Sequence, residues 1–118
     1  MNRILVIDDE PNIRESISVL LEEKGYEVQT AENGREGVKE LDSFQPDLVL
    51  TDISMPDMEG IEFLKVVTRE KRDLPVIVMS GNAVGGKFLK AAGLFGAAST
   101  LRKPFSNKDL LAAIERLL

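Results

Sequence analysis

Two hydrophobic patterns alternate along the chain and predict strands and helices in turn. Short apolar runs, some with every second residue apolar, are typical of strands, and five occur at residues 4–7, 26–31, 48–51, 75–79 and 97–101. Between these runs apolar residues recur three or four positions apart, which is the spacing of a helix with one buried face. The apolar positions of four predicted helices are Ile13, Ile17, Leu20 and Leu21; Val38, Leu41 and Phe44; Ile61, Leu64 and Val67; and Leu110, Leu111, Ile114, Leu117 and Leu118.

Residues typical of helix ends flank these segments. Pro11 suits the first turn of the first helix, and Gly25 suits its end. Asn33 with Glu36 resembles a capping box, and Ser106 can cap the last helix. A fifth, weaker helix is predicted at residues 84–92, where glycines lower helix stability.

Five strands that alternate with five helices predict an α/β fold, in which helices cover both faces of an open, doubly wound parallel sheet. No repeat, linker or low-complexity segment divides the chain, so residues 1–118 are expected to form one domain. In such sheets ligands bind beyond the carboxyl ends of the strands. With the flavodoxin-like strand order 2-1-3-4-5, the first and third strands are neighbours.

Composition and charge exclude several kinds of function. The chain has a net charge of −5, from 20 acidic and 15 basic residues, which argues against direct nucleic-acid binding. It contains no Cys and no His, so disulfides, thiolate chemistry, histidine-based catalytic triads and a phosphohistidine on this chain are excluded. The apolar runs are too short for a membrane span and no signal-peptide pattern is present, so we expect a cytoplasmic protein.

Four of the five predicted strands end in residues that can do chemistry. Asp8 and Asp9 follow the first strand, Asp52 the third, Ser80 the fourth and Lys103 the fifth. Carboxylates in one crevice repel each other unless a cation is present, and Mg²⁺ commonly takes one or two carboxylates with phosphate oxygens. A carboxylate can form an aspartyl phosphate, while a lysine and a hydroxyl can contact the phosphoryl oxygens. The set predicts phosphoryl transfer.

Each of these residues alone has a plainer explanation. Asp8 and Asp9 suit the positive end of the following helix, and Asp52 suits a turn. Lys103 alone would be a solvated charge and Ser80 a cap. Their joint occurrence at successive strand ends, with complementary chemistry, favours one site.

At this point the whole sequence resembles the response regulator receiver family. Any one of the matching segments is weak, but their order and spacing together are specific. The strand order used above is partly taken from this family. The matching segments are Ile4-Leu5-Val6-Ile7-Asp8-Asp9-Glu10, Asp52-Ile53-Ser54-Met55-Pro56 with Gly60, Ser80-Gly81 and Lys103-Pro104-Phe105.

The resemblance implies a role for each site residue. Asp52 would be the phosphoacceptor, and Lys103 would pair first with the acidic site and then with the phosphoryl group. Ser80 would move toward that group and signal its presence. The peptide bond between Lys103 and Pro104 would be cis. The Mg²⁺ ligands would be Asp9, Asp52 and the main-chain carbonyl of Ser54, with Asp8 acting largely through water.

The resemblance also implies partners. The phosphoryl group would come from a sensor histidine kinase or a histidine phosphotransfer protein, and the signal would pass to a downstream effector protein or domain. The chain would catalyse only its own phosphorylation and dephosphorylation, as a monomer or weak dimer. The surface that changes is expected to include the fourth helix, the fifth strand and the last helix.

One position departs from the family pattern. Thr100 stands where the family often has an aromatic residue that changes rotamer together with the hydroxyl residue. The common coupling between Ser80 and this position therefore cannot operate in its usual form. Because residues 84–87 are rich in glycine, our hypothesis is that this segment is the part that moves.

Three alternatives are weaker. Residues 81–87 satisfy the phosphate-loop pattern G-x-x-x-x-G-K, but Phe88 stands where Ser or Thr is needed. A phosphatase or hydrolase that used Asp52 would need a second acid or base nearby, and position 54, two residues further on, is a serine. A degenerate receiver that serves only as a docking module is disfavoured, because all five site residues are intact.

Overall fold

The computed structural model describes residues 2–52, 59–70, 73–81, 93 and 96–118. The helix expected at residues 84–92, and with it the proposed moving segment and most of the phosphate-loop pattern, lies outside this described part. The nine described elements, in chain order, are β1 (Arg3–Ile7), α1 (Pro11–Glu23), β2 (Glu27–Ala31), α2 (Gly34–Phe44), β3 (Leu48–Asp52), α3 (Glu59–Glu70), β4 (Val76–Ser80), β5 (Ser99–Arg102) and α5 (Asn107–Leu117).

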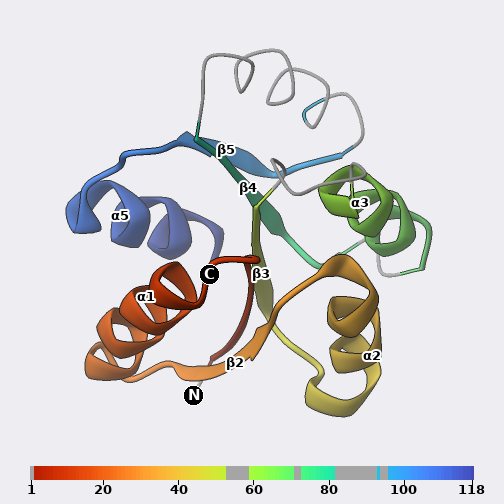
Figure 1. Ribbon diagram of the computed structural model, residues 1–118, viewed down its shortest axis with the longest axis horizontal. Coiled ribbons are helices and arrows are strands. Elements are labelled where there is room, and N and C mark those ends of the chain that lie inside the picture. Colours follow the sequence, from red (N-terminus) through yellow and green to blue (C-terminus); the bar gives the residue numbers. More distant parts are fainter. Residues whose placement is uncertain (1, 53–58, 71–72, 82–92, 94–95) are drawn as a thin grey trace.

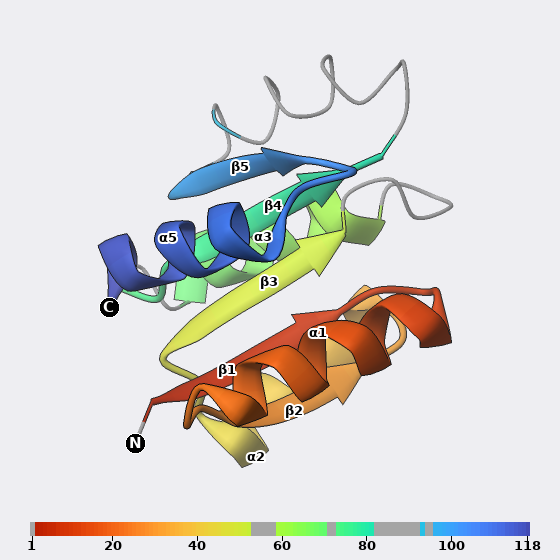
Figure 2. The ribbon, with the colours of Figure 1, turned by 90° about the vertical axis from the view of Figure 1, so that its left-hand side faces the viewer.

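The five strands form one parallel sheet in the order β2-β1-β3-β4-β5, which confirms the predicted flavodoxin-like order. Helices α1 and α5 cover one face of the sheet, and α2 and α3 cover the other (Figure 1). All strands run in the same direction, so their carboxyl ends lie along one edge, on the right of Figure 2. The doubly wound architecture is therefore as expected.

Alternate residues of each central strand enter two separate hydrophobic cores. In β1, Ile4 and Val6 pack with residues of α1 and α5, whereas Leu5 and Ile7 pack with residues of α2 and α3. Strands β3 and β4 are buried along their whole length. Burial on both faces explains why these strands appear in the sequence as continuous apolar runs.

The predicted helix ends are confirmed in most details. Pro11 begins α1, and Gly25, with a φ of 92°, follows its end. The Asn33 side chain accepts a hydrogen bond from the Glu36 amide at 2.9 Å, but the Glu36 carboxylate accepts from the amide of Glu32 rather than from that of Asn33. At α5 the Ser106 hydroxyl accepts from the Asp109 amide at 3.0 Å.

Several expected element boundaries need correction, among them the fifth strand, which was expected at residues 97–101 and is β5 at Ser99–Arg102. Both β3 and β4 extend one residue beyond the predicted runs, so Asp52 and Ser80 are the last residues of their strands. Ladder pairing explains this, because Asp52 is still aligned with Met79, and Ser80 with Arg102. Leu118 was expected on the buried face of the last helix, but it lies beyond the end of α5 and is 43% exposed.

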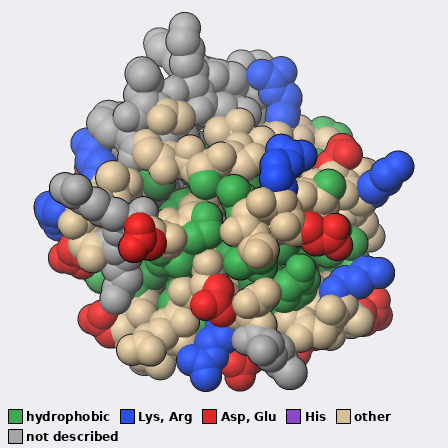
Figure 3. Space-filling model, turned by 180° about the vertical axis from the view of Figure 1, so that it is seen from behind, with side chains coloured by type: hydrophobic (Ala, Val, Ile, Leu, Met, Phe, Trp, Pro, Cys, Tyr) green, Lys and Arg blue, Asp and Glu red, His purple; other side chains and the backbone are tan. Residues whose placement is uncertain are grey.

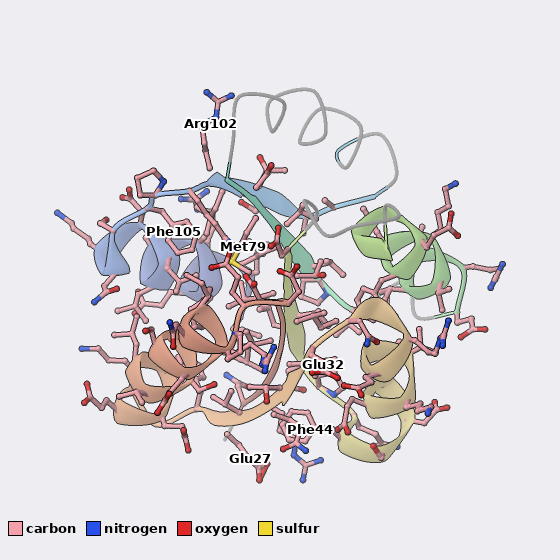
Figure 4. All side chains as sticks on the ribbon, in the orientation of Figure 1. Glu27, Glu32, Phe44, Met79, Arg102 and Phe105 are labelled. Carbon is pink, nitrogen blue, oxygen red and sulfur yellow. The ribbon has the colours of Figure 1, made fainter. Side chains whose placement is uncertain are left out.

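The amino ends of the strands form the opposite edge of the sheet. There the Arg3 guanidinium donates to a Glu27 carboxylate oxygen at 2.9 Å and to the Phe44 carbonyl at 3.0 Å. Figure 4 shows Glu27 and Phe44 close together at this edge.

Seen from behind, the molecule carries acidic and basic side chains around hydrophobic ones (Figure 3). No helix of the described residues is long and apolar enough to span a membrane.

Candidate functional site

The parallel sheet gathers the predicted site residues at its carboxyl edge. Asp8 directly follows β1, Asp52 ends β3, Ser80 ends β4 and Lys103 directly follows β5. Of these residues, Asp8 and Ser80 are fully buried and Asp52 is only 4% exposed. Burying a charged carboxylate costs free energy unless the carboxylate is paired with a positive charge. Their burial at a ligand-binding edge therefore calls for positively charged partners.

Lys103 supplies one such charge. Its ammonium group lies 2.9 Å from Asp8 Oδ2 and 3.4 Å from Asp52 Oδ2, so a single cation links β5 to the ends of β1 and β3. Burial lowers the pKa of Lys103, but the hydrogen bond to Asp8 and the charges of Asp52 and Asp8 outweigh it and raise the pKa above its ordinary value of 10.5. Lys103 is therefore fully charged at neutral pH.

Asp8 is held at every polar atom. Besides the bond to Lys103, its Oδ1 accepts from the Glu10 amide at 2.9 Å, and its own amide donates to the Ala31 carbonyl at 3.2 Å. Its carbonyl accepts from Arg14 Nη1 at 2.7 Å. Asp8 thus has a fixed position between the strand and α1.

An open cavity of about 620 Å³ lies next to these groups. Asp9, Asp52 and Lys103 line it, so two of the predicted aspartates and the predicted lysine border one solvent-accessible volume. The other described lining residues belong to the β1–α1 connection, to α1, to the segments that follow β4 and β5, and to the start of α5; they are Glu10, Ile13, Ser16, Ile17, Gly81, Pro104, Phe105 and Asn107. Phe105, labelled in Figure 4, comes from the connection between β5 and α5. Asp52 is therefore open to a small group that enters this cavity.

The donor set of the site fits a hard divalent cation. Carboxylate oxygens of Asp8, Asp9 and Glu10 can all lie within 4.8 Å of one another, and Asp52 shares the cavity with Asp9. Oxygen ligands of this kind, with room for water, are those that Mg²⁺ prefers. The described part of the site brings together Asp8, Asp9 and Asp52, while Ser54, the expected carbonyl ligand, lies outside the described residues. Among the described residues, the four carboxylates of Asp8, Asp9, Glu10 and Asp52 outnumber the two nearby cations, Lys103 and Arg14, so negative charge is in surplus.

The two predicted switch residues, Ser80 and Thr100, do not line the described cavity. Ser80 is buried and is not among the described residues that line the cavity; its carbonyl accepts from the Lys103 amide at 2.7 Å. Thr100 is exposed on β5, aligned with Val78. The Lys103–Pro104 peptide bond is cis, as the resemblance implied.

Two residues that shape the site, Arg14 and Gly81, were given no role in it from the sequence. Arg14 holds the Asp8 carbonyl, and its signal in the sequence was a cation in the first turn of a helix, where the helix dipole disfavours positive charge. Gly81 lies beside the lysine, and a Cβ at this position would be 3.3 Å from Lys103 Cδ. A glycine here leaves room for the aliphatic part of Lys103.

Comparisons with known proteins agree with this geometry. The family model of the response regulator receiver domain matches residues 4–115. The phosphate regulon transcriptional regulatory protein PhoB of Escherichia coli is 39% identical over 119 residues, which cover 98% of this chain and 51% of that protein. The alkaline phosphatase synthesis transcriptional regulatory protein PhoP of Bacillus subtilis is 35% identical over 98% of this chain and 48% of its own length. This chain therefore spans about half the length of these relatives.

Solved structures lead to the same family. The response regulator TrrA of Thermotoga maritima, crystallised in complex with Mg²⁺ and BeF, is 37% identical, has a TM-score of 0.89 and is covered completely, as is this chain. A response regulator receiver domain protein of Clostridium thermocellum is 34% identical with a TM-score of 0.92, over 99% of this chain and 94% of that one. With the matching family model and the gathered carboxylates and lysine, these similarities show that the chain belongs to the response regulator receiver domain family.

Proposed function

We propose that residues 1–118 act as one receiver domain whose Asp52 accepts a phosphoryl group from a phosphohistidine of a sensor kinase or phosphotransfer protein. The observation that carries this assignment is the position of Asp52. Asp52 is the last residue of the central strand β3 and is buried. Its carboxylate lies 3.4 Å from the Lys103 ammonium group, and the residue lines the same open cavity as Asp9. A nucleophile, a cationic partner and access for a donor thus coincide.

In the proposed reaction an oxygen of Asp52 attacks phosphorus and forms a P–O bond. The P–N bond of the phosphohistidine breaks, and its electron pair returns to the imidazole ring of the donor. Lys103, which already pairs with Asp52, is placed to contact an oxygen of the transferred group. Positioning and charge neutralisation are most of what phosphoryl transfer requires.

Mg²⁺, when bound, would neutralise negative charge on the carboxylates and on the phosphoryl oxygens. Asp9 and Asp52, which share the cavity, would be its carboxylate ligands, with the carbonyl of Ser54. Asp8 is fully buried and is not among the described residues that line the cavity, so it would act largely through water. The complex of Mg²⁺ and BeF with the relative from Thermotoga maritima supports the choice of metal.

Phosphorylation adds a charge of about −1.5 to −2 in a confined site and can thereby shift a two-state surface. Ser80 would report the new group, and Thr100 would take the place of the usual aromatic partner in the switch. The curated relatives are transcriptional regulators about twice as long as this chain, which supports an effector protein or domain as the recipient of the signal. We place the domain in the cytoplasm, as a monomer or weak dimer without direct nucleic-acid contacts or enzymatic action on other substrates.

The test is the intact mass of the chain after incubation with acetyl phosphate, with and without Mg²⁺. We expect a Mg²⁺-dependent gain of one phosphoryl group in the wild type and in Asp73→Asn, which removes an exposed carboxylate that lies just before β4, at the opposite edge of the sheet. Asp52→Asn, which keeps the shape of the side chain, should show no gain. A folded wild type that gains no mass with Mg²⁺ present would overturn the assignment and indicate a docking module instead.

A further inference from the structure

Arg14 lies beside the carboxylates of the site without lining the described cavity, and the proposed reaction does not use it. It belongs to the first turns of α1, and its Nη1 donates to the Asp8 carbonyl at 2.7 Å. The same residue closes the first helical hydrogen bond, from its amide to the Glu10 carbonyl at 3.1 Å. Arg14 thus donates to the carbonyls of both neighbours of Asp9 in the chain, Asp8 and Glu10.

The position of this arginine is electrostatically unfavourable for a helix. A cation near the amino end of a helix opposes the helix dipole, and the carboxylates of Asp8, Asp9 and Glu10, which precede α1, offset only part of that cost. A charge-assisted hydrogen bond to a buried carbonyl is one of the stronger protein hydrogen bonds, and it compensates this cost. The arginine therefore stabilises the turn more than it stabilises the helix.

The Asp8 carbonyl needs such a donor. Asp8 is fully buried and lies one residue beyond β1, where the ladder between the strands has ended. A buried carbonyl without a partner costs about 1–3 kcal/mol. The guanidinium fixes this carbonyl and with it the plane of the peptide that joins Asp8 to Asp9.

That peptide determines where the Asp9 side chain begins. Asp8 is held by Lys103 and by the Glu10 amide, whereas Asp9 is exposed and lines the cavity. We propose that Arg14 is a positioning residue of the cation site, whose bond to the Asp8 carbonyl holds the Asp8–Asp9 turn in the shape that presents the Asp9 carboxylate to Mg²⁺. This inference rests on the proposed function, because it assumes that a divalent cation binds there.

The proposal can be separated from a simple charge effect by its sign. As a neighbouring positive charge, Arg14 would repel Mg²⁺, so its removal would tighten binding. As a positioning residue it favours binding, so its removal should weaken binding. Loss of a group that orients a metal ligand from outside the coordination sphere typically lowers metal affinity by 10-fold to 100-fold, and we expect about tenfold here.

The experiment is a calorimetric titration with Mg²⁺ alone, without a phosphodonor, on wild type, Arg14→Met, Arg14→Lys and Arg69→Met. Arg69 is exposed near the end of α3 and serves as the control for the loss of one positive charge. Both Arg14 variants should bind Mg²⁺ more weakly, with Arg14→Lys closer to the wild type because it keeps a charged donor. Arg69→Met should bind as the wild type does.

A spectroscopic readout keeps the test independent of overall stability. In ¹H–¹⁵N spectra without Mg²⁺, the amide signals of Asp9 and Glu10 should shift in Arg14→Met, while those of the strands stay in place. Unchanged or tighter Mg²⁺ binding in a folded Arg14→Met overturns the positioning role while leaving the proposed function intact. A wild type that binds no Mg²⁺ overturns both.

Discussion

The two edges of the sheet carry similar charges in different surroundings. At the amino edge Arg3 pairs with Glu27 at 2.9 Å, with side chains that are 46% and 48% exposed. At the carboxyl edge Lys103 pairs with Asp8, also at 2.9 Å, with side chains that are 17% and 0% exposed. The two ion pairs have the same length, so geometry alone does not distinguish them.

The difference lies in solvent and in charge balance. Around Arg3 the backbone takes part, since the Arg3 amide donates to Asp47 and the guanidinium donates to the Phe44 carbonyl at the end of α2. Lys103 pairs with two buried aspartates, Asp8 and Asp52, and Asp9 lines the same open cavity. Water screens the first network, which serves to join elements. The second has a surplus of buried negative charge, which an incoming cation can neutralise.

The largest effect is expected from Lys103→Met. This change leaves the buried Asp8 carboxylate without its ammonium partner, and removal of one member of a buried ion pair typically costs about 3–5 kcal/mol. Urea denaturation without divalent cations should show this loss in the free energy of unfolding. An exposed lysine, Lys108→Met, is the control and should change it by less than about 0.5 kcal/mol.

The pH dependence gives a check on the same pair. The pKa of Lys103 is raised in the folded state, so its contribution to stability is complete below pH 10.5 and is lost as the pH rises through the folded-state pKa. The wild type should therefore lose part of its advantage over Lys103→Met above pH 10.5. A stability difference that stays constant through this alkaline range would contradict a charged pair.

Asp9→Asn should have a smaller effect, and of opposite sign. Its carboxylate can approach those of Asp8 and Glu10 within 4.8 Å, so without metal the three charges repel one another. Removing one should raise the free energy of unfolding by about 1 kcal/mol, because Asp9 is exposed and partly screened. With excess Mg²⁺ the wild type should become more stable than Asp9→Asn, because only a protein that binds the cation gains stability from it. A metal-free Asp9→Asn less stable than the wild type would show that repulsion does not dominate this edge.

The sequence was enough to predict the edge at which these charges meet. Strand order and parallel direction bring Asp8, Asp52 and Lys103 together, and these follow from the period of the apolar residues and from the family resemblance. The strand ends were predicted less accurately. Asp52 and Ser80 are not apolar, yet each belongs to its strand because it is still paired with a residue of the neighbouring strand.

Contacts made by side chains across the fold were not predictable in this way. Gly37 lies inside α2, where propensity disfavours glycine, yet a Cβ there would overlap Ile7 Cδ1 and lie 3.0 Å from Phe63 Cε1. Arg14 similarly has a place in the helix that its bond to the Asp8 carbonyl explains. Both roles depend on atoms from other elements, and local sequence patterns contain no information about those distances.

The smallest effect is expected at the amino edge, from Glu27→Gln. Exposed ion pairs contribute about 0–1 kcal/mol, and Arg3 keeps its bonds to Asp47 and Phe44 after the change. The loss in unfolding free energy should be below about 1 kcal/mol and should shrink further at high salt, because salt screens exposed charges. Phosphorylation by acetyl phosphate should be unchanged. If Glu27→Gln instead cost as much as Lys103→Met, exposure would not be what separates the two edges, and the surplus charge near Asp52 would be left as the only difference between them.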